Sequence, residues 1–289
     1  MKYAAPSSVE EATSLLSSSP SAQVFAGATD IVPQIHGGRQ APEVLVDLKK
    51  IDELVSLTSD DKKWTVGAAT PTVELTENQA FSQEFPGISE AAGLIGSDQI
   101  QSRSSLGGNL CNGSPAADSV PAMMVNGTRA LIAGPKGNRL VDVSEVVTGP
   151  GQTCLDSDEF VVEFEIDRAP SLTGDAYLRM IPRTEMDIAV VGAGARVTLA
   201  EDGTIAAAAL ALGAVAPTVV RVTAAEEALI GTTADEDTLA VVAAAASAVC
   251  NPIDDKRGTI AYREQVAGVL AKRAVLIAME RAQQRNGDV

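Results

Sequence analysis

The sequence predicts an α+β protein of two domains that meet near residue 176. Its 289 residues are enough chain for about two domains of typical size. Hydrophobic residues make up 45% of the chain and charged residues 21%, which supplies a core and argues against disorder. Strand and helix patterns alternate up to the boundary, and alanine-rich helical patterns dominate beyond it. We therefore expect one domain at 1–176 and a smaller one at 177–289.

The first domain opens with a helix followed by a strand. Ser8 and Glu11 form a capping-box pattern at the start of a short amphipathic helix. The segment AQVFAG at 22–27 fits a buried strand that ends in a glycine turn. Residues 71–95 have a helical pattern, and the Ser-, Gly- and Asn-rich stretch 101–114 fits a loop. Further strands are predicted at 43–48, on both sides of a polar hairpin tip at 59–63, and around Ala130, Leu140, Val161 and Leu178.

The second domain is predicted to combine antiparallel strands with helices. Strands near 188–199 and 205–212 flank a Glu-Asp-Gly turn. Three helices are predicted near 224–229, 235–249 and 259–285. The last helix places four apolar residues on one face, and we expect that face to pack in the core rather than bind a partner. These residues are Tyr262, Val266, Leu270 and Ile277.

Charge and composition exclude several classes of function. The net charge is −16, the sequence pI is near 4.4 and no basic stretch occurs, so nucleic acid is not an expected partner. The three cysteines, Cys111, Cys154 and Cys250, lie far apart in the sequence, so we expect no metal or iron–sulfur site in this chain. The N-terminal residues lack a signal-peptide pattern and no apolar run is long enough for a transmembrane segment. We expect a cytoplasmic protein.

Common catalytic and nucleotide-binding motifs are missing. His36 is the single histidine, and no Gly-x-Ser-x-Gly elbow is present for it to serve. A Walker sequence is absent as well. The segment GAGARV at 192–197 lacks a third glycine and continues into a strand, whereas a dinucleotide-binding fold needs a helix there.

Two segments rich in glycine and small hydroxyl residues remain as candidates for a binding site. They are AGATD at 26–30 and SSLGGNLCNGSPAAD at 104–118. Glycine lets backbone N–H groups approach an anion closely, so both segments are able to hold a pyrophosphate without a lysine. The N–H groups of the first segment are expected to precede a helix, whose N-terminus favours an anion. The alternative is that both segments are ordinary turns.

Five segments, taken in order, carry a resemblance to a known family. They read AGATDI, SLGGNLCNGSPAADSVPAMM, AYLRMIPRTEMDIAVV, GAVAPTVVRVTAAEEAL and AYREQVAGVLAKRAV. Together they closely resemble the FAD-binding subunits of molybdenum hydroxylases, such as the medium subunit of aerobic carbon monoxide dehydrogenase and the flavin domain of xanthine dehydrogenase. The resemblance implies an FAD-binding domain of the vanillyl-alcohol-oxidase (PCMH) type in two subdomains. A small domain of three antiparallel strands and helices is implied to follow it.

The resemblance also implies which residues bind FAD. The first segment would surround the pyrophosphate, and the second would form the phosphate and ribityl wall. Asp118 would lie near the flavin, and Arg179 would lie near the isoalloxazine, where the family usually has lysine. The implied cofactor-binding residues are Val24, Phe25, Ala26, Gly27, Ala28, Thr29, Asp30, Ile31, Ile95, Ser105, Gly107, Gly108, Asn109, Ser114, Asp118, Val161 and Arg179.

Several of these residues also have simpler interpretations. Asp118 fits the cap of a helix at 119–125, and Arg179 fits a surface ion pair with Glu185 or Asp187. Cys111 is expected to be a small buried side chain rather than a redox thiol. Ala28 stands where many relatives have glycine, and an alanine should fit there if its φ is negative.

The function implied by the resemblance is that of an electron-transfer subunit. The chain would carry FAD, accept electrons from an iron–sulfur small subunit with [2Fe-2S] clusters, and pass them to NAD, a quinone or dioxygen. Hydroxylation would take place on a molybdopterin large subunit, so no catalytic residue is assigned here and the substrate stays open. A dimer of heterotrimers is the expected assembly. The alternatives are a self-contained FAD-dependent oxidoreductase of related fold and a scaffold that has lost its flavin.

Overall fold

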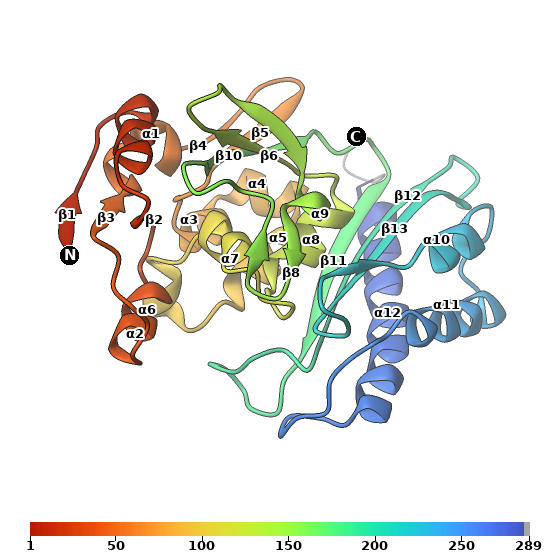
Figure 1. The fold of residues 1–289 in the computed structure, drawn as a ribbon. Helices are drawn as coiled ribbons and strands as arrows, with labels where there is room; N and C mark the ends of the chain where they lie inside the picture. The colour runs from red at the N-terminus through yellow and green to blue at the C-terminus, as the bar shows by residue number, and fades with distance from the viewer. Residues whose placement is uncertain (286–289) are drawn as a thin grey trace.

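The computed structural model describes residues 1–285, and their N-terminal unit is a small parallel sheet with two helices (Figure 1). Its elements are β1 (Lys2–Ala4), α1 (Val9–Ser18), β2 (Ala22–Phe25), α2 (Ile31–His36) and β3 (Val44–Asp47). The strands lie in the order β1-β3-β2 and are parallel, and β2 is half-buried rather than buried as predicted. Ser8 Oγ accepts a hydrogen bond from the Glu11 N–H at 3.2 Å and so caps α1. The Glu11 carboxylate bonds the Ser7 N–H, so only half of the predicted capping box forms.

The second unit is built on a five-stranded antiparallel sheet in the order β4-β5-β10-β6-β7. The predicted hairpin with its tip at 59–63 is confirmed by the pairing of the first two of these strands. Two 3-10 turns, η1 (Leu48–Lys50) and η2 (Asp52–Val55), lead into the unit. Its strands and helices are β4 (Leu57–Ser59), β5 (Lys63–Gly67), α3 (Thr72–Glu77), α4 (Gln79–Glu84), α5 (Pro86–Gly93), α6 (Asp98–Gln101), α7 (Leu106–Cys111), α8 (Ser119–Val125), β6 (Arg129–Ala133), β7 (Arg139–Asp142), α9 (Val143–Val146), β8 (Val147–Gly149), β9 (Gln152–Thr153) and β10 (Phe160–Asp167).

The helical segments of this unit agree with the prediction in one place and differ from it in another. Residues 71–95 are helical as predicted and form three short helices, because Asn78 caps α4 through its Oδ1 and Pro86 begins α5. The stretch 101–114, predicted as a loop, contains α7. Ser105 Oγ accepts from the Gly108 N–H at 3.1 Å and caps this helix, while Leu110 is buried beneath it. A cap and buried leucines therefore outweigh the low helix propensity of Gly-Gly-Asn.

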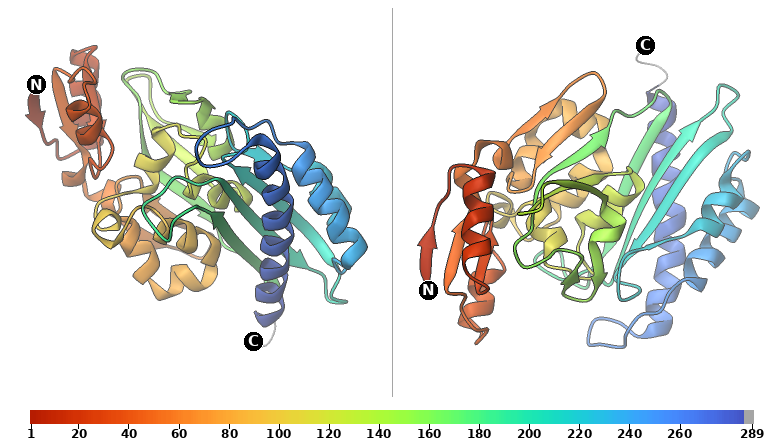
Figure 2. Two further views of the ribbon diagram at one scale, coloured as in Figure 1. Left: turned by 90° about the horizontal axis from the view of Figure 1, so that it is seen from below. Right: turned by 45° about the horizontal axis from the view of Figure 1, so that its top comes forward.

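The third unit is an antiparallel sheet in the order β11-β12-β13-β14, with three helices beside it (Figure 2). The three long strands agree with the prediction, and a two-residue strand is added at one edge. Its elements are β11 (Thr173–Met180), β12 (Val191–Leu199), β13 (Ile205–Gly213), β14 (Val220–Arg221), α10 (Thr223–Leu229), α11 (Glu236–Ala248) and α12 (Ile260–Gln284). Strand β11, which includes the predicted strand at Leu178, belongs to this sheet and not to that of the second unit.

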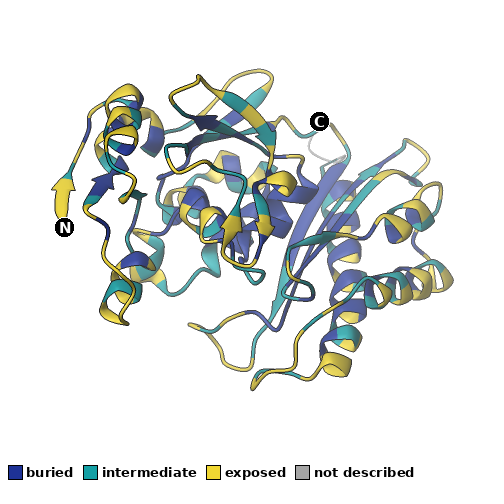
Figure 3. Ribbon diagram, viewed as in Figure 1, coloured by how far each residue is buried: buried dark blue, intermediate teal, exposed yellow. Residues whose placement is uncertain are grey.

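The second and third units each have a hydrophobic cluster, and a further cluster joins the N-terminal unit to the second unit through residues such as Val46 and Phe160. The buried residues of the sheets are visible in Figure 3. Helix α12 packs closely on β11, because a Cβ on Gly174 would lie 2.3 Å from the Ala278 carbonyl oxygen. Alanines make up five of the ten buried residues of α12. Tyr262 is 39% exposed, so its predicted place in the core is wrong. No helix within residues 1–285 is long and apolar enough to span a bilayer.

Candidate functional site

A cavity of about 430 Å³ lies between the N-terminal unit and the second unit. Its walls come from the end of β2, the turn into α2, helix α7 and the tip of the β8–β9 hairpin, and Figure 1 shows α2 and α7 on either side. Segments that are far apart in sequence are therefore brought to one place. Twelve of the seventeen predicted residues line it: Val24, Phe25, Ala26, Gly27, Ala28, Thr29, Asp30, Ile31, Ile95, Ser105, Gly108 and Asn109.

The turn at 26–30 forms the first wall and is fixed by contacts to backbone. A Cβ on Gly27 would lie 1.8 Å from the Arg103 carbonyl oxygen, so only glycine permits this approach. Arg103 Nε donates a hydrogen bond of 3.1 Å to the Gly27 carbonyl, and Lys49 Nζ donates one of 2.7 Å to that of Ala26. The two units therefore hold the turn from both sides.

The turn presents unpaired donors. Within residues 1–285, none of the five consecutive N–H groups at positions 27–31 donates a hydrogen bond to the protein. Buried or half-buried N–H groups normally find an acceptor, so this turn is suited to an anionic ligand. Ala28 has φ of +64°, so the condition of a negative φ is not met and the alanine is held in a left-handed conformation. The left-handed conformation follows from the abrupt change from β2 to α2, whose first carbonyl acceptor is that of Ala28.

Helix α7 forms the second wall, and its adjacent glycines have different surroundings. Gly108 is exposed on the cavity, and a Cβ there would lie no closer than 3.3 Å to any neighbour outside its own helix backbone. Gly107 is buried on the opposite side, and a Cβ there would lie 2.4 Å from the Ala68 carbonyl oxygen. The Asn109 side chain accepts hydrogen bonds from the Ser119 N–H and Oγ at 3.2 and 2.7 Å, which ties α7 to α8.

Five predicted residues lie outside the cavity lining: Gly107, Ser114, Asp118, Val161 and Arg179. Val161 is buried in the core of the second unit, and Ser114 Oγ accepts from the Ala116 N–H in the turn before α8. The structure therefore gives these two residues packing and turn contacts.

Asp118 and Arg179 form a buried pair. Arg179 Nη1 donates to Asp118 Oδ2 at 2.8 Å, and the Tyr177 hydroxyl donates to Oδ1 at 2.8 Å. The Arg179 side chain is 3% exposed, so its interpretation as a surface ion pair with Glu185 or Asp187 is wrong. The Asp118 side chain makes no capping bond to α8, so that alternative is wrong too. Burial raises the pKa of Asp118, and the charge of Arg179 and the bond from Tyr177 counter that rise.

The pair reaches the cavity indirectly. Arg179 Nη1 also donates to the Leu94 carbonyl oxygen at 2.9 Å. Leu94 precedes Ile95, which lines the cavity. The arginine therefore links the end of β11 to the cavity wall through backbone, without presenting its charge to the cavity.

The cavity has seven further lining residues that were not among the predicted cofactor-binding residues, although Ser104, Cys111 and Asn112 lie in the candidate segment 104–118. The seven are Gln23, Gln34, Arg39, Ser104, Cys111, Asn112 and Gly151. The expectation that Cys111 is buried is wrong, because it lies exposed on the cavity wall at the end of α7. The Gly37-Gly38 pair after α2 could have indicated in the sequence that Arg39 lies near the cavity. Such a pair ends a helix and turns the chain back over it.

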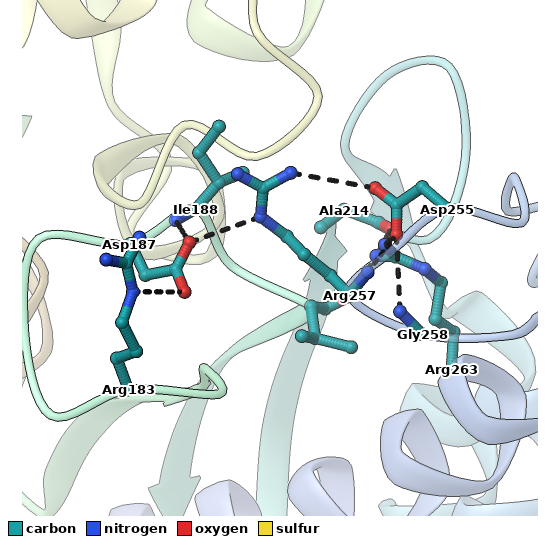
Figure 4. Close-up of polar contacts among 9 residues, drawn as sticks. Arg183, Asp187, Ile188, Ala214, Asp255, Arg257, Gly258 and Arg263 are labelled. Carbon is teal, nitrogen blue, oxygen red and sulfur yellow. Dashed lines mark hydrogen bonds and ion pairs between the residues drawn. The ribbon is translucent and has the colours of Figure 1, made fainter.

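A chain of ion pairs holds the loop that follows β11 (Figure 4). Asp187 accepts from Arg183 and from Arg257, each at 3.2 Å, and these contacts together with the Ile188 N–H lower the pKa of Asp187 to about 2. Asp255 accepts from Arg263 at 2.7 Å, and Arg263 in turn donates to the Val190 carbonyl oxygen at 2.6 Å. The loop is thereby tied to the start of α12. Within residues 1–285, no cluster of three or more His, Cys, Asp or Glu side chains is placed to hold a metal ion.

Comparison with known families covers nearly the whole chain. Residues 1–168 match the FAD binding domain in molybdopterin dehydrogenase, and residues 176–278 match the CO dehydrogenase flavoprotein C-terminal domain. The carbon monoxide dehydrogenase medium chain of Hydrogenophaga pseudoflava is 31% identical over 97% of both chains. The xanthine dehydrogenase FAD-binding subunit of Escherichia coli O157:H7 is 28% identical over 97% of this chain and 96% of its own length.

Solved structures agree with the sequence comparisons. The carbon monoxide dehydrogenase of Hydrogenophaga pseudoflava superposes with a TM-score of 0.93 over 97% of this chain and 98% of its own, at 31% identity. Quinoline 2-oxidoreductase from Pseudomonas putida 86 superposes with a TM-score of 0.91 over 98% of each chain, at 26% identity. The architecture of this chain is therefore shared by a chain of a carbon monoxide dehydrogenase and a chain of a quinoline oxidoreductase.

Proposed function

Because the chain belongs to the family of FAD-binding subunits of molybdenum hydroxylases, we propose that it transfers electrons from a [2Fe-2S] partner subunit to an external acceptor. The observation that carries the proposal is the end-to-end match to proteins that are themselves named as subunits. Those relatives are matched over 96–97% of their own length, which favours the same role for this chain, as one subunit of a larger enzyme.

The residues of the cavity suit FAD. When bound, FAD accepts and releases electrons singly or in pairs, which suits a link between an iron–sulfur donor and a range of acceptors. The unpaired N–H groups at 27–31 would bind the negatively charged diphosphate through backbone donors. Gly108 leaves room for close approach on the opposite wall, and Asn109 holds that wall against α8. The protein's contribution is thus to bind and orient the cofactor.

Arg179 and Asp118 are proposed to position the cavity wall. Their charges pair with each other, so the arginine has little net charge to offer a ligand. Its second hydrogen bond fixes the backbone next to Ile95. This arrangement supports an effect on the orientation of the flavin more than a direct electrostatic effect on it.

The proposed assembly contains two other kinds of subunit. An iron–sulfur small subunit would donate electrons, and a molybdopterin large subunit would oxidise the organic substrate. We propose a dimer of such heterotrimers, with each interface well above about 1,000 Å² because the association would be permanent. Relatives that are named as the medium chain or the FAD subunit of a dehydrogenase support an assembly of several subunits.

Anaerobic reconstitution tests the proposal. We expect the purified chain with FAD to keep its flavin absorbance near 450 nm, a general flavin property, when organic substrate is added alone. We expect the absorbance to bleach once both partner subunits are present. Bleaching by an organic substrate with this chain alone would contradict the proposal and favour a self-contained flavoenzyme. A chain that binds no FAD would favour a scaffold.

A further inference from the structure

Arg39 stands out among the residues of the cavity because its charge is not neutralised by the protein. It lines the cavity and is exposed, and it forms no ion pair within residues 1–285. Of the residues within 1–285 that line the cavity, it is the one lysine or arginine, in a chain whose net charge is −16. The carboxylate of Asp30 also lines the cavity, yet no ion pair joins the two.

Backbone geometry directs Arg39 toward the cavity. Helix α2 ends in a Schellman motif, in which the Arg39 N–H donates to the Gln34 carbonyl at 3.0 Å and the Gly38 N–H donates to that of Ile35 at 3.1 Å. Gly38 has φ of +100°, a conformation that glycine adopts without strain. The motif turns the chain back, so Arg39 lies beside Gln34 instead of pointing away from the helix.

Neutral amides then hold the guanidinium. Arg39 Nη1 donates to Gln34 Oε1, and Nη2 donates to Gln23 Oε1 at 3.4 Å. The Gln34 amide also reaches Asn112 Oδ1 at 3.4 Å, across the cavity on the side of α7. All four of these residues line the cavity. Amide oxygens orient the guanidinium without cancelling its charge, which keeps that charge available to a ligand.

We propose that Arg39 is a cationic ligand for the diphosphate-bearing half of FAD. The inference rests on the proposed FAD-binding function and adds a charged contact to the backbone donors of the turn. An arginine provides paired N–H donors that match phosphate oxygens, and such charge-assisted bonds are about twice as strong as neutral ones. The position of Arg39 at the cavity edge makes its contribution one of affinity and retention of the cofactor.

Equilibrium titration of the apoprotein with FAD, followed by flavin fluorescence, tests this inference. We expect Arg39→Gln to raise the dissociation constant about tenfold, and Arg39→Lys to restore part of the loss because it keeps the charge without the fork geometry. Arg273→Gln is the matched control, because Arg273 is an exposed arginine of α12 far from the cavity lining. The control should bind FAD like the wild type. Circular dichroism should show that all three variants are folded.

Two further measurements locate the contact. Added salt should weaken FAD binding more in the wild type than in Arg39→Gln, because salt screens a charge that the variant lacks. ADP, used as a competitor, should lose affinity in Arg39→Gln by about the same factor as FAD. Two results would overturn this inference but leave the proposed function standing. One is an unaltered FAD affinity in Arg39→Gln, and the other is a loss of FAD affinity in that variant without a loss of ADP affinity. A wild-type chain that takes up no FAD overturns the proposed function together with it.

Discussion

The two glycine-rich segments of the cavity look alike in sequence but have different structures. The first, at 26–30, is an open turn whose N–H groups are unpaired within residues 1–285. The second contains α7. There the Ser105 hydroxyl accepts a hydrogen bond from the Gly108 N–H, and the N–H groups that follow donate to carbonyl groups of the helix. The first segment therefore offers hydrogen-bond donors to a ligand, and the second offers a wall that leaves room for close approach. Similar composition does not imply an equal role in binding.

Gly27→Ala should have the largest effect, because it tests the close contact of the first segment. The new Cβ would lie 1.8 Å from backbone oxygen of Arg103, and backbone yields less readily than a side chain. We expect a loss of about 3 kcal/mol in the free energy of unfolding and loss of FAD binding. Urea unfolding and FAD titration measure the two effects. A variant with wild-type stability would show that the turn is not fixed by this contact.

Gly108→Val should separate binding from folding in the second segment. The position is exposed on the cavity, so a branched side chain should exclude the cofactor while the fold remains. We expect FAD affinity to fall more than tenfold with a change of less than about 1 kcal/mol in stability. Gly107→Ala is the matched control, since its Cβ would meet Ala68 in the core and should reduce stability first. Full flavin content in Gly108→Val would remove α7 from the binding site.

Ala28→Gly should stabilise the first segment. A left-handed conformation costs an alanine about 1 kcal/mol relative to glycine, and the native φ is +64°. We expect the free energy of unfolding to rise by about 1 kcal/mol, with FAD affinity kept. Thermal unfolding of the apoprotein is a direct measurement. A decrease in the melting temperature would mean that the methyl group contributes packing that outweighs the strain.

Asp30→Asn should have the smallest effect, and it depends on pH. Burial raises the pKa of Asp30 above the ordinary 3.8, so the folded chain binds this proton more readily than the unfolded chain. Its contribution to stability therefore grows as pH falls through the raised pKa, is fully present below 3.8, and is lost as pH rises above the raised pKa. Protonation also removes a negative charge from the cavity that is proposed to hold the diphosphate.

We expect FAD to bind the wild type about two- to threefold more tightly as pH falls through the raised pKa of Asp30. The effect is small because solvent partly screens the charge of the Asp30 carboxylate. Asp30→Asn should bind with the tighter affinity at neutral pH and show a flatter pH profile. FAD titrations at several pH values give the comparison. A steeper profile in the variant would assign the pH dependence to another group.

Local patterns in the sequence predicted the fold better than they predicted the site. The cap at Ser8 and the hairpin with its tip at 59–63 depend on neighbouring residues and were correct. The helix after Ser105 was missed because its stability comes from a cap and from burial of leucines, which composition does not reveal. Once this helix forms, the two adjacent glycines lie on different sides of it, with Gly108 facing the cavity and Gly107 facing the core.

Contacts between distant residues account for the remaining differences. The resemblance pointed to both Asp118 and Arg179, yet neither pattern indicated that they pair with each other across 61 positions. Arg39 was missed for a different reason, since its role follows from the backbone path after Gly38 rather than from a motif. The division at residue 176 and the individual FAD contacts stay predictions.

The order in which the chain is synthesised has a consequence for the cavity. Every residue that lines it lies between Gln23 and Gly151, and the last strand of the five-stranded sheet behind it, β10, ends at Asp167. All of this is synthesised before β12, β13 and the three C-terminal helices. Because domains generally fold as units from the N-terminus during synthesis, the cavity is free to assemble, and to meet its cofactor, on a nascent chain.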